Sequence, residues 1–121
     1  SGVPSRGGPQ VEAGKARPLA TTGAKRTAMM PGVPTVAEAG YPGFEATNWY
    51  AFVAPGKTPK DLLDFWNREL TRVLNDPGVN AELAKHGLDP APGTRDELAQ
   101  YIERENEKWG KVVRDAKITP E

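Results

Sequence analysis

The sequence predicts an α/β fold that is mostly helical after residue 58 and contains one or two strands. An aromatic-rich run at residues 44–54, bounded by Gly and Pro, has the composition of a strand. From Thr58 onward, apolar residues recur with a helical period between capping and proline signals. One strand cannot pair its own backbone groups, so the run at 44–54 predicts neighbours. These are the weaker stretch 19–22, a second copy of the chain, or strands of a larger sheet.

Composition and charge argue against several classes of protein. The 121 residues can form one core, and they are polar for a globular domain, with 37% hydrophobic and 26% charged residues and a mean hydropathy of −0.61. Lys and Arg number 16, as do Asp and Glu, so the basic excess typical of nucleic-acid binding is lacking. There is no Cys for a disulfide and no apolar run long enough for a membrane span. The opening SGVPSRGGPQ lacks the apolar region of a signal peptide, which leaves a mature or truncated start and a cytosolic protein as alternatives.

The first third of the chain is expected to contain little regular structure. Ser1–Gln10 is rich in Gly and Pro and is expected to be an irregular terminus. Residues 23–32 form a basic loop, in which Lys25 and Arg26 either are solvated or meet an anionic ligand.

The stretch at residues 33–59 combines a capped turn with the predicted strand. Thr35 and Glu38 have the spacing of a capping box, and a glycine two residues later limits the helix to about one turn. A turn between two aromatics follows. Along the strand, alternation of side chains places Trp49 on one face and Asn48 on the other.

Three helices are expected after the strand. The first runs from an N-cap at Thr58 to about Asn75. A short second helix occupies residues 76–87, between an Asp-Pro pair and a closing glycine. The third is the longest, at about 95–116, and opens with a capping box at Thr94.

The faces of these helices are assigned from their periodicity. Trp66 and Trp109 lie on apolar stripes, so they are expected to pack in a core. Glu103, Glu105 and Glu107 alternate with basic residues on the third helix, a pattern typical of a solvated face.

No catalytic constellation is present in the sequence. The single histidine, His86, falls at the end of a short helix, where a cationic side chain is favoured by the helix dipole. No cluster of His, Cys and Asp has the spacing of metal ligands. The nucleophile-elbow, phosphate-loop and dinucleotide-binding motifs are absent. We therefore expect no enzyme activity, no cofactor and no metal.

The residues favour ligand binding over catalysis. Backbone N–H groups at the start of a helical turn can hold a carboxylate without a charged side chain, and the Thr35 turn offers such groups. Aromatic residues beside the turn can wall the apolar part of a ligand. The alternatives are an ordinary structural cap at Thr35 and core packing of the strand aromatics. The candidate ligand-binding residues are Pro34, Thr35, Val36, Tyr41, Phe44, Asn48 and Trp49.

Three blocks of the sequence resemble one known family. They are GKARPLATTGAKR (14–26), VPTVAEAGYPGFEATNWYAFVAPGKTP (33–59) and KWGKVVRDAKITPE (108–121). In this order they resemble the C-terminal part of the receptors of tripartite tricarboxylate transporters, the extracytoplasmic solute-binding proteins of the Bug or TctC type. The resemblance implies a two-lobed, type II periplasmic-binding-protein-like fold that closes on a small organic carboxylate. It also implies a periplasmic location and integral membrane transporter subunits as partners.

The resemblance also implies how the chain divides. Residues 1–43 would be a remnant of the second lobe with its connecting loops, including a helix end, a glycine turn and a strand that Pro18 weakens. Residues 44–121 would be the strand that returns through the hinge, plus three C-terminal helices of the first lobe. Such receptors are of two-domain size, so the chain is either a fragment or a short paralogue. The alternative function is that of a truncated, non-transport module that self-associates as a homo-oligomer through its unpaired strand.

Overall fold

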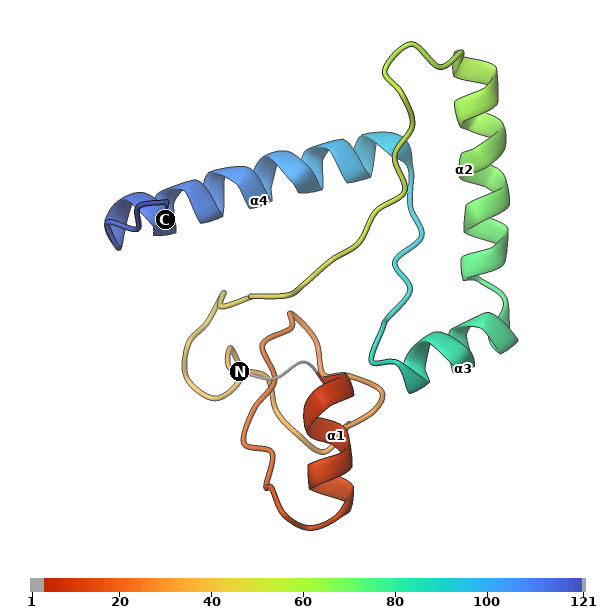
Figure 1. The fold of residues 1–121 in the computed structure, drawn as a ribbon. Coiled ribbons are helices and arrows are strands. Elements are labelled where there is room, and N and C mark those ends of the chain that lie inside the picture. The colour runs from red at the N-terminus through yellow and green to blue at the C-terminus, as the bar shows by residue number, and fades with distance from the viewer. Residues whose placement is uncertain (1–3, 121) are drawn as a thin grey trace.

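The computed structural model describes residues 4–120, and this part of the chain contains four helices. They are α1 (Pro4–Glu12), α2 (Lys60–Leu74), α3 (Pro77–Lys85) and α4 (Arg95–Asp115). Loops surround α1, and an extended segment leads from them to α2 and α3, which precede the long α4 (Figure 1). None of these helices is both long enough and apolar enough to cross a membrane.

Local caps start α3 and α4 where the sequence predicts them. The Asp76 carboxylate accepts a hydrogen bond from the Val79 N–H at 2.9 Å and so begins α3. At α4, Thr94 Oγ1 accepts from the Glu97 N–H at 3.1 Å, and the Glu97 carboxylate accepts from the Thr94 N–H at 2.7 Å. Both bonds of the capping box are therefore formed, and both predicted helix starts are confirmed.

The start of α2 differs from the prediction by one residue. Pro59 is the N-cap, with φ −56° and ψ 143°, and no side chain caps the helix. The predicted N-cap role of Thr58 is therefore wrong. Because the extended ψ of Pro59 puts the first helical residue at Lys60, Thr58 lies one position too early to cap.

The structure contains a helix, α1, where the sequence predicts an irregular terminus, so that prediction is wrong. Residues 4–10 of the predicted irregular stretch are helical, while residues 1–3 lie outside the described part of the chain. A proline opens the helix, a position where its missing N–H costs nothing. At the other end, Gly14 has φ +70°, and the N–H groups of Lys15 and Ala16 both donate to the Gln10 carbonyl. The helix therefore forms despite the poor helix propensity of its glycines and its internal proline, and these bonds close its C-terminal end.

The predicted strand at 44–54 does not form a β-ladder. Among residues 4–120, the β-pairing is an isolated parallel bridge between Thr21 and Thr35. The extended segment touches it once, where the Ala46 N–H donates to the Thr22 carbonyl at 2.9 Å. The weak stretch 19–22 is thus the neighbour that this segment finds. The rest of the segment remains extended without a partner strand, and the contact that its backbone makes with α4 comes from a side chain, Lys108.

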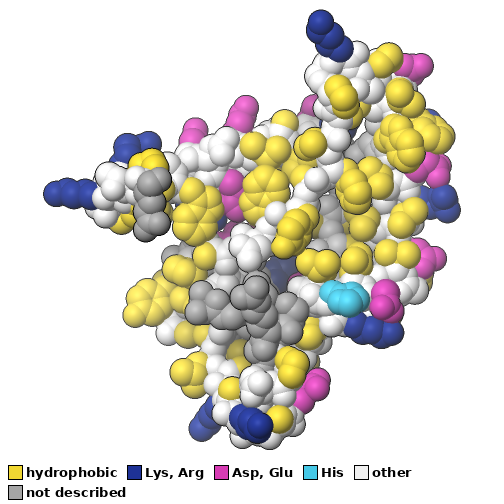
Figure 2. Space-filling view, in the orientation of Figure 1, with side chains coloured by type: hydrophobic (Ala, Val, Ile, Leu, Met, Phe, Trp, Pro, Cys, Tyr) yellow, Lys and Arg dark blue, Asp and Glu magenta, His cyan; other side chains and the backbone are white. Residues whose placement is uncertain are grey.

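The described residues do not enclose a hydrophobic core. No hydrophobic side chain among those with assigned burial is buried, and Trp66 and Trp109 are 53% and 41% exposed. The prediction that both tryptophans lie in a core is therefore wrong for this chain. Hydrophobic side chains spread over α2 and the region between α2 and α4 (Figure 2). The predicted apolar stripes exist, but residues 4–120 cover them only in part.

Candidate functional site

The Thr35 turn is the best-buried part of the described chain. Thr35 is 1% exposed, and its hydroxyl accepts a hydrogen bond from the Glu38 N–H at 3.1 Å. The Glu38 carboxylate accepts in return from the Thr35 N–H at 3.4 Å, which confirms the predicted capping box. The residues that follow form turns rather than a regular helix, and Gly40 ends them with φ +124°.

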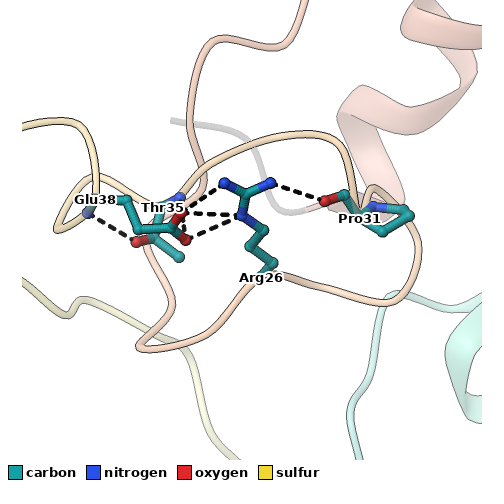
Figure 3. A network of polar contacts seen from close by, with 4 residues as sticks. All are labelled: Arg26, Pro31, Thr35 and Glu38. Carbon is teal, nitrogen blue, oxygen red and sulfur yellow. Dashed lines mark hydrogen bonds and ion pairs between the residues drawn. The ribbon is translucent and has the colours of Figure 1, made fainter.

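An arginine fixes the acidic member of this capping box. The Arg26 guanidinium lies 2.6 Å from the Glu38 carboxylate through Nη2, and its Nε also donates to that carboxylate (Figure 3). Its Nη1 donates to the Pro31 carbonyl at 3.2 Å. Hydrogen bonding from Arg26 lowers the pKa of Glu38, so the carboxylate stays charged while it caps the turn. Arg26 is therefore paired within the turn, although its side chain remains nearly half exposed.

Most amides of the turn are already used within the protein. The Val36 N–H donates to the Thr21 carbonyl at 2.8 Å, and the Ala39 N–H donates to the Thr35 carbonyl at 3.0 Å. The Pro34 carbonyl accepts from the Thr21 N–H at 2.9 Å. Within the described residues, the Ala37 N–H has no hydrogen-bond partner. An anion at this turn would thus find one open amide, not a full set.

A second feature is an open hollow between the extended segment and α4. It has a volume of about 510 Å³ and is lined by Thr47, Asn48, Trp49, Tyr50 and Trp109. Two of the predicted ligand-binding residues, Asn48 and Trp49, lie together here. Because Trp109 comes from α4, the hollow joins residues that are far apart in the sequence.

A polar cluster on α4 borders the hollow. The Trp49 ring meets the Tyr101 ring edge-on, with 5.6 Å between centroids. The Tyr101 hydroxyl donates to the Glu105 carboxylate at 2.8 Å, and Lys108 Nζ lies 2.8 Å from the other carboxylate oxygen. Glu105 is 5% exposed, so its assignment to a solvated face is wrong.

A sequence signal for this cluster was available. Glu105 lies four residues after Tyr101 and four before Trp109, which places it on the apolar stripe of α4 rather than opposite it. A carboxylate on an apolar stripe must be paired when it is buried, and Lys108 supplies the partner three residues later. The alternation of acidic residues at 103–107 indicated a solvated face and led to the wrong assignment of Glu105.

The charges of the cluster are balanced. Hydrogen bonding from Lys108 lowers the pKa of Glu105, against the opposing effect of burial. Burial, followed by the hydrogen bond to the charged Glu105, raises the pKa of Tyr101. The phenol therefore keeps its proton at neutral pH and acts as a hydrogen-bond donor. Such a cluster positions groups and does not exchange protons near pH 7.

The predicted site residues fall into two groups. Pro34, Thr35 and Val36 lie in the buried turn, whereas Asn48 and Trp49 line the hollow. Tyr41 and Phe44 form the connecting turn, with the Phe44 N–H donating to the Tyr41 carbonyl at 3.0 Å, and both side chains are exposed. Between the two groups lie Thr21, which pairs with Thr35, and Thr22, which pairs with Ala46.

The remaining polar groups of residues 4–120 show no catalytic arrangement. His86 caps the end of α3, with Nε2 at 3.7 Å from Glu82, as its position in the sequence predicts. A smaller hollow of about 210 Å³ beside Asp64 and Arg95 contains the ion pair of those two residues at 2.8 Å. In the described part of the chain, no three His, Asp or Glu side chains gather as metal ligands would.

Comparison with known proteins places the chain in a family. Residues 4–118 match the family described as "Tripartite tricarboxylate transporter family receptor". Protein BugT of Bordetella pertussis is 34% identical over 105 residues, which cover 87% of this chain and 32% of that protein. The R. palustris protein Rpa4515, solved with adipate, is 34% identical, with a TM-score of 0.77 over 97% of this chain and 39% of that one. The periplasmic binding protein BugD is 26% identical, with a TM-score of 0.74 over 95% of this chain and 39% of that one.

The chain spans about a third of the length of BugT and 39% of each of the two solved structures. A partial match of this kind agrees with the apolar stripes of the helices, which the described residues cover only in part. With its helices and its short β-pairing, the chain forms part of a two-lobed periplasmic-binding-protein fold. It belongs to the family of tripartite tricarboxylate transporter receptors.

Proposed function

We propose that this chain is part of an extracytoplasmic solute-binding receptor that captures a small organic carboxylate for a tripartite tricarboxylate transporter. The observation that carries the proposal is the likeness, over 97% of the chain, to a structure solved with adipate. The receptor would work in the periplasm and hand its ligand to integral membrane subunits. It would bind without catalysis and without a cofactor.

The geometry supports a dicarboxylate-sized ligand. The hollow of about 510 Å³ falls within the roughly 300–1,000 Å³ of small-molecule sites. Its lining joins two tryptophan rings, which suit methylene groups, to the amide of Asn48 and the hydroxyl of Thr47, which suit carboxylate oxygens. The Arg26–Glu38 pair cancels its own charge, so recognition would come from neutral donors.

The ligand-binding residues of the proposal are grouped by the two parts of the site. The turn contributes Pro34, Thr35 and Val36, with the open amide of Ala37 as the added donor. The connecting turn and the hollow contribute Tyr41, Phe44, Asn48 and Trp49. In this proposal, residues 1–43 belong to the second lobe, and residues 44–121 return through the hinge to the first lobe. Closure of the lobes would bring the two groups to one ligand.

Titration calorimetry on the native full-length protein tests this function. Adipate and shorter and longer dicarboxylates are titrated into the wild type, Thr35→Val and Trp49→Ala. Lys111→Met is the control, because Lys111 is an exposed side chain of α4 outside the hollow. We expect binding that weakens in the first two variants and not in the control. Equal affinity in all four proteins would refute the site, and no dicarboxylate binding by the wild type would refute the function.

A self-associating module remains the second candidate. The observation that favours it is the unpaired extended segment, along which Tyr50, Phe52 and Val53 are all at least 70% exposed. Exposed apolar edges of this kind pair with other chains. Sedimentation equilibrium of the wild type and Phe52→Lys tests it. A wild-type mass that rises with concentration, and a variant that stays monomeric, would support the module, whereas a constant monomer mass would exclude it.

A further inference from the structure

One peptide group joins the extended segment to α4 on one side and to the Thr21–Thr35 pairing on the other. The Glu45 carbonyl accepts a hydrogen bond from Lys108 Nζ at 3.1 Å. The amide of the same peptide group, the Ala46 N–H, donates to the Thr22 carbonyl at 2.9 Å. In a trans peptide the two groups point in opposite directions. The peptide therefore lies between α4 on one side and the Thr21–Thr35 pairing on the other.

The lysine that makes this contact is itself held by neighbours on α4. Lys108 Nζ lies 2.8 Å from the buried Glu105 carboxylate, which also accepts from the Tyr101 hydroxyl. The ammonium lies 5.2 Å from the centroid of the Trp109 ring, within the range of a cation–π contact. The ammonium thus donates one hydrogen bond to the Glu45 carbonyl and forms an ion pair with the Glu105 carboxylate.

Two of these residues, Tyr101 and Trp109, also contact or line the hollow. Tyr101 contacts the Trp49 ring edge-on, and Trp109 lines the hollow together with Asn48 and Trp49. The carbonyl that Lys108 holds lies three residues before Asn48 and four before Trp49. The chain is extended here, so successive side chains point to opposite sides. The orientation of the Glu45 carbonyl therefore determines the directions in which the Asn48 and Trp49 side chains point.

We infer that Lys108 is a positioning residue of the ligand cleft, which fixes the Glu45–Ala46 peptide so that Asn48 and Trp49 are presented over α4. It acts through the backbone and does not touch the ligand. The Glu105–Lys108 pair alone could be a stabilising contact within one helix. The bond to a carbonyl 63 residues away in the sequence gives it a second role. The inference concerns the site of the proposed receptor and rests on that proposal for its effect on ligand affinity.

The test uses variants of the native full-length protein that separate the two roles. Lys108→Met keeps the aliphatic stem and removes the donor, but it leaves Glu105 buried without its partner, which can unfold the protein. The double variant Lys108→Met/Glu105→Gln removes both charges together and keeps the Tyr101 acceptor. Lys108→Arg restores a charged donor. Lys111→Met is the matched control, because it removes an exposed lysine of α4 that pairs with Asp115 at 2.6 Å.

Two readouts keep this inference apart from the proposed function. Hydrogen exchange followed by mass spectrometry reports on residues 44–50 without any ligand, and within 45–50 of the described chain the Ala46 amide is the one that donates a backbone hydrogen bond. We expect exchange at that amide to rise by about tenfold or more in the double variant, the factor expected for loss of a charge-assisted hydrogen bond, and to stay near wild type in Lys108→Arg and Lys111→Met. Calorimetry with adipate should show a weaker affinity in the same double variant.

Each outcome of these two measurements tests a different claim. Unchanged exchange at residues 44–50 in the double variant overturns the positioning role, whatever the ligand data show. Faster exchange with an unchanged adipate affinity overturns the link to the cleft. If the wild type binds no dicarboxylate, the proposed function fails. The exchange data then still decide whether Lys108 holds the segment.

Discussion

Arg26 and Glu38 form a fork of three hydrogen bonds between the basic loop and the Thr35 turn, the shortest at 2.6 Å. The pair joins residues 12 positions apart, and Glu38 in turn caps the amide of Thr35. Both side chains are nearly half exposed, so solvent and salt weaken the attraction. Its structural effect lies in fixing where the Glu38 carboxylate points.

Replacement of Arg26 should weaken carboxylate binding more than it weakens the fold. In Arg26→Met, the freed Glu38 places an unbalanced negative charge beside the proposed ligand turn. We expect affinity for adipate to fall by a factor of about five or less, the scale of an exposed charge effect, and the loss to shrink at high salt. Calorimetry at two ionic strengths measures it. Arg72→Met, which breaks an exposed pair with Glu69 on α2, is the control. An equal loss in the control would contradict the assignment.

Thr94 caps α4, whereas Thr58 lies near the start of α2 without capping it, so the two threonines allow a paired test of capping. Thr94→Ala removes the hydroxyl that accepts from the Glu97 N–H, and we expect a loss of about 1 kcal/mol in the free energy of unfolding. Thr58→Ala should change stability by less than about 0.5 kcal/mol, because no side chain caps α2. Urea unfolding followed by circular dichroism measures both. A larger loss at Thr58 than at Thr94 would reverse our assignment of the caps.

Local signals explain why α3 and α4 could be predicted from the sequence. Their caps, Asp76 and Thr94, act on amides three residues away, so the information lies within one turn of chain. The Thr35–Glu38 box is local in the same way. The prediction that residues 4–10 are irregular is wrong for a related reason. It was based on glycine and proline content, and it did not include the bonds from residues after the helix to the Gln10 carbonyl, which close the end of α1.

Non-local pairing explains most of what the sequence did not show. A strand at 44–54 depends on neighbours that the segment itself cannot encode, and it finds a single backbone partner in Thr22. The contact of Lys108 with Glu45 spans 63 residues and has no sequence signature. The burial of Glu105 could have been predicted, because its position on the apolar stripe is a local property of α4. The family resemblance supplied the two-lobed fold, which neither periodicity nor composition indicates.

Tyr101 should make stability sensitive to alkaline pH. Its pKa is raised in the folded state, mainly by burial and then by the charged Glu105. A raised folded pKa stabilises the fold fully below the ordinary tyrosine pKa of about 10, and this contribution is lost as the pH rises through the folded value. The stability of wild type relative to Tyr101→Phe should therefore be highest below that range and fall above it. Urea midpoints between pH 7 and 11 measure this. A wild-type advantage that grows with alkaline pH would show the opposite sign.

Glu105 should make stability sensitive to acid in the opposite sense. Its folded pKa is lowered, chiefly by Lys108, so the charged form stabilises the fold above the ordinary carboxylate pKa of about 4.3. This contribution is lost as the pH falls through the folded value, where the carboxylate takes up a proton and its attraction to Lys108 ends. We expect Glu105→Gln to lower the urea midpoint near pH 7 and to lose this effect progressively below about pH 4.

A matched variant separates this effect from general acid unfolding. Glu103→Gln changes the same charge on the same helix at an exposed position. Its midpoint should follow wild type throughout the titration, because surface charges of this kind contribute little. The comparison is made by urea unfolding at half-unit steps between pH 3 and pH 7. If the Glu105 and Glu103 variants behave alike, the Tyr101–Glu105–Lys108 cluster does not stabilise the folded state. The bond from Lys108 to the Glu45 carbonyl would then have to form without help from the Glu105 pair, with the Trp109 ring as the neighbour that steadies the ammonium.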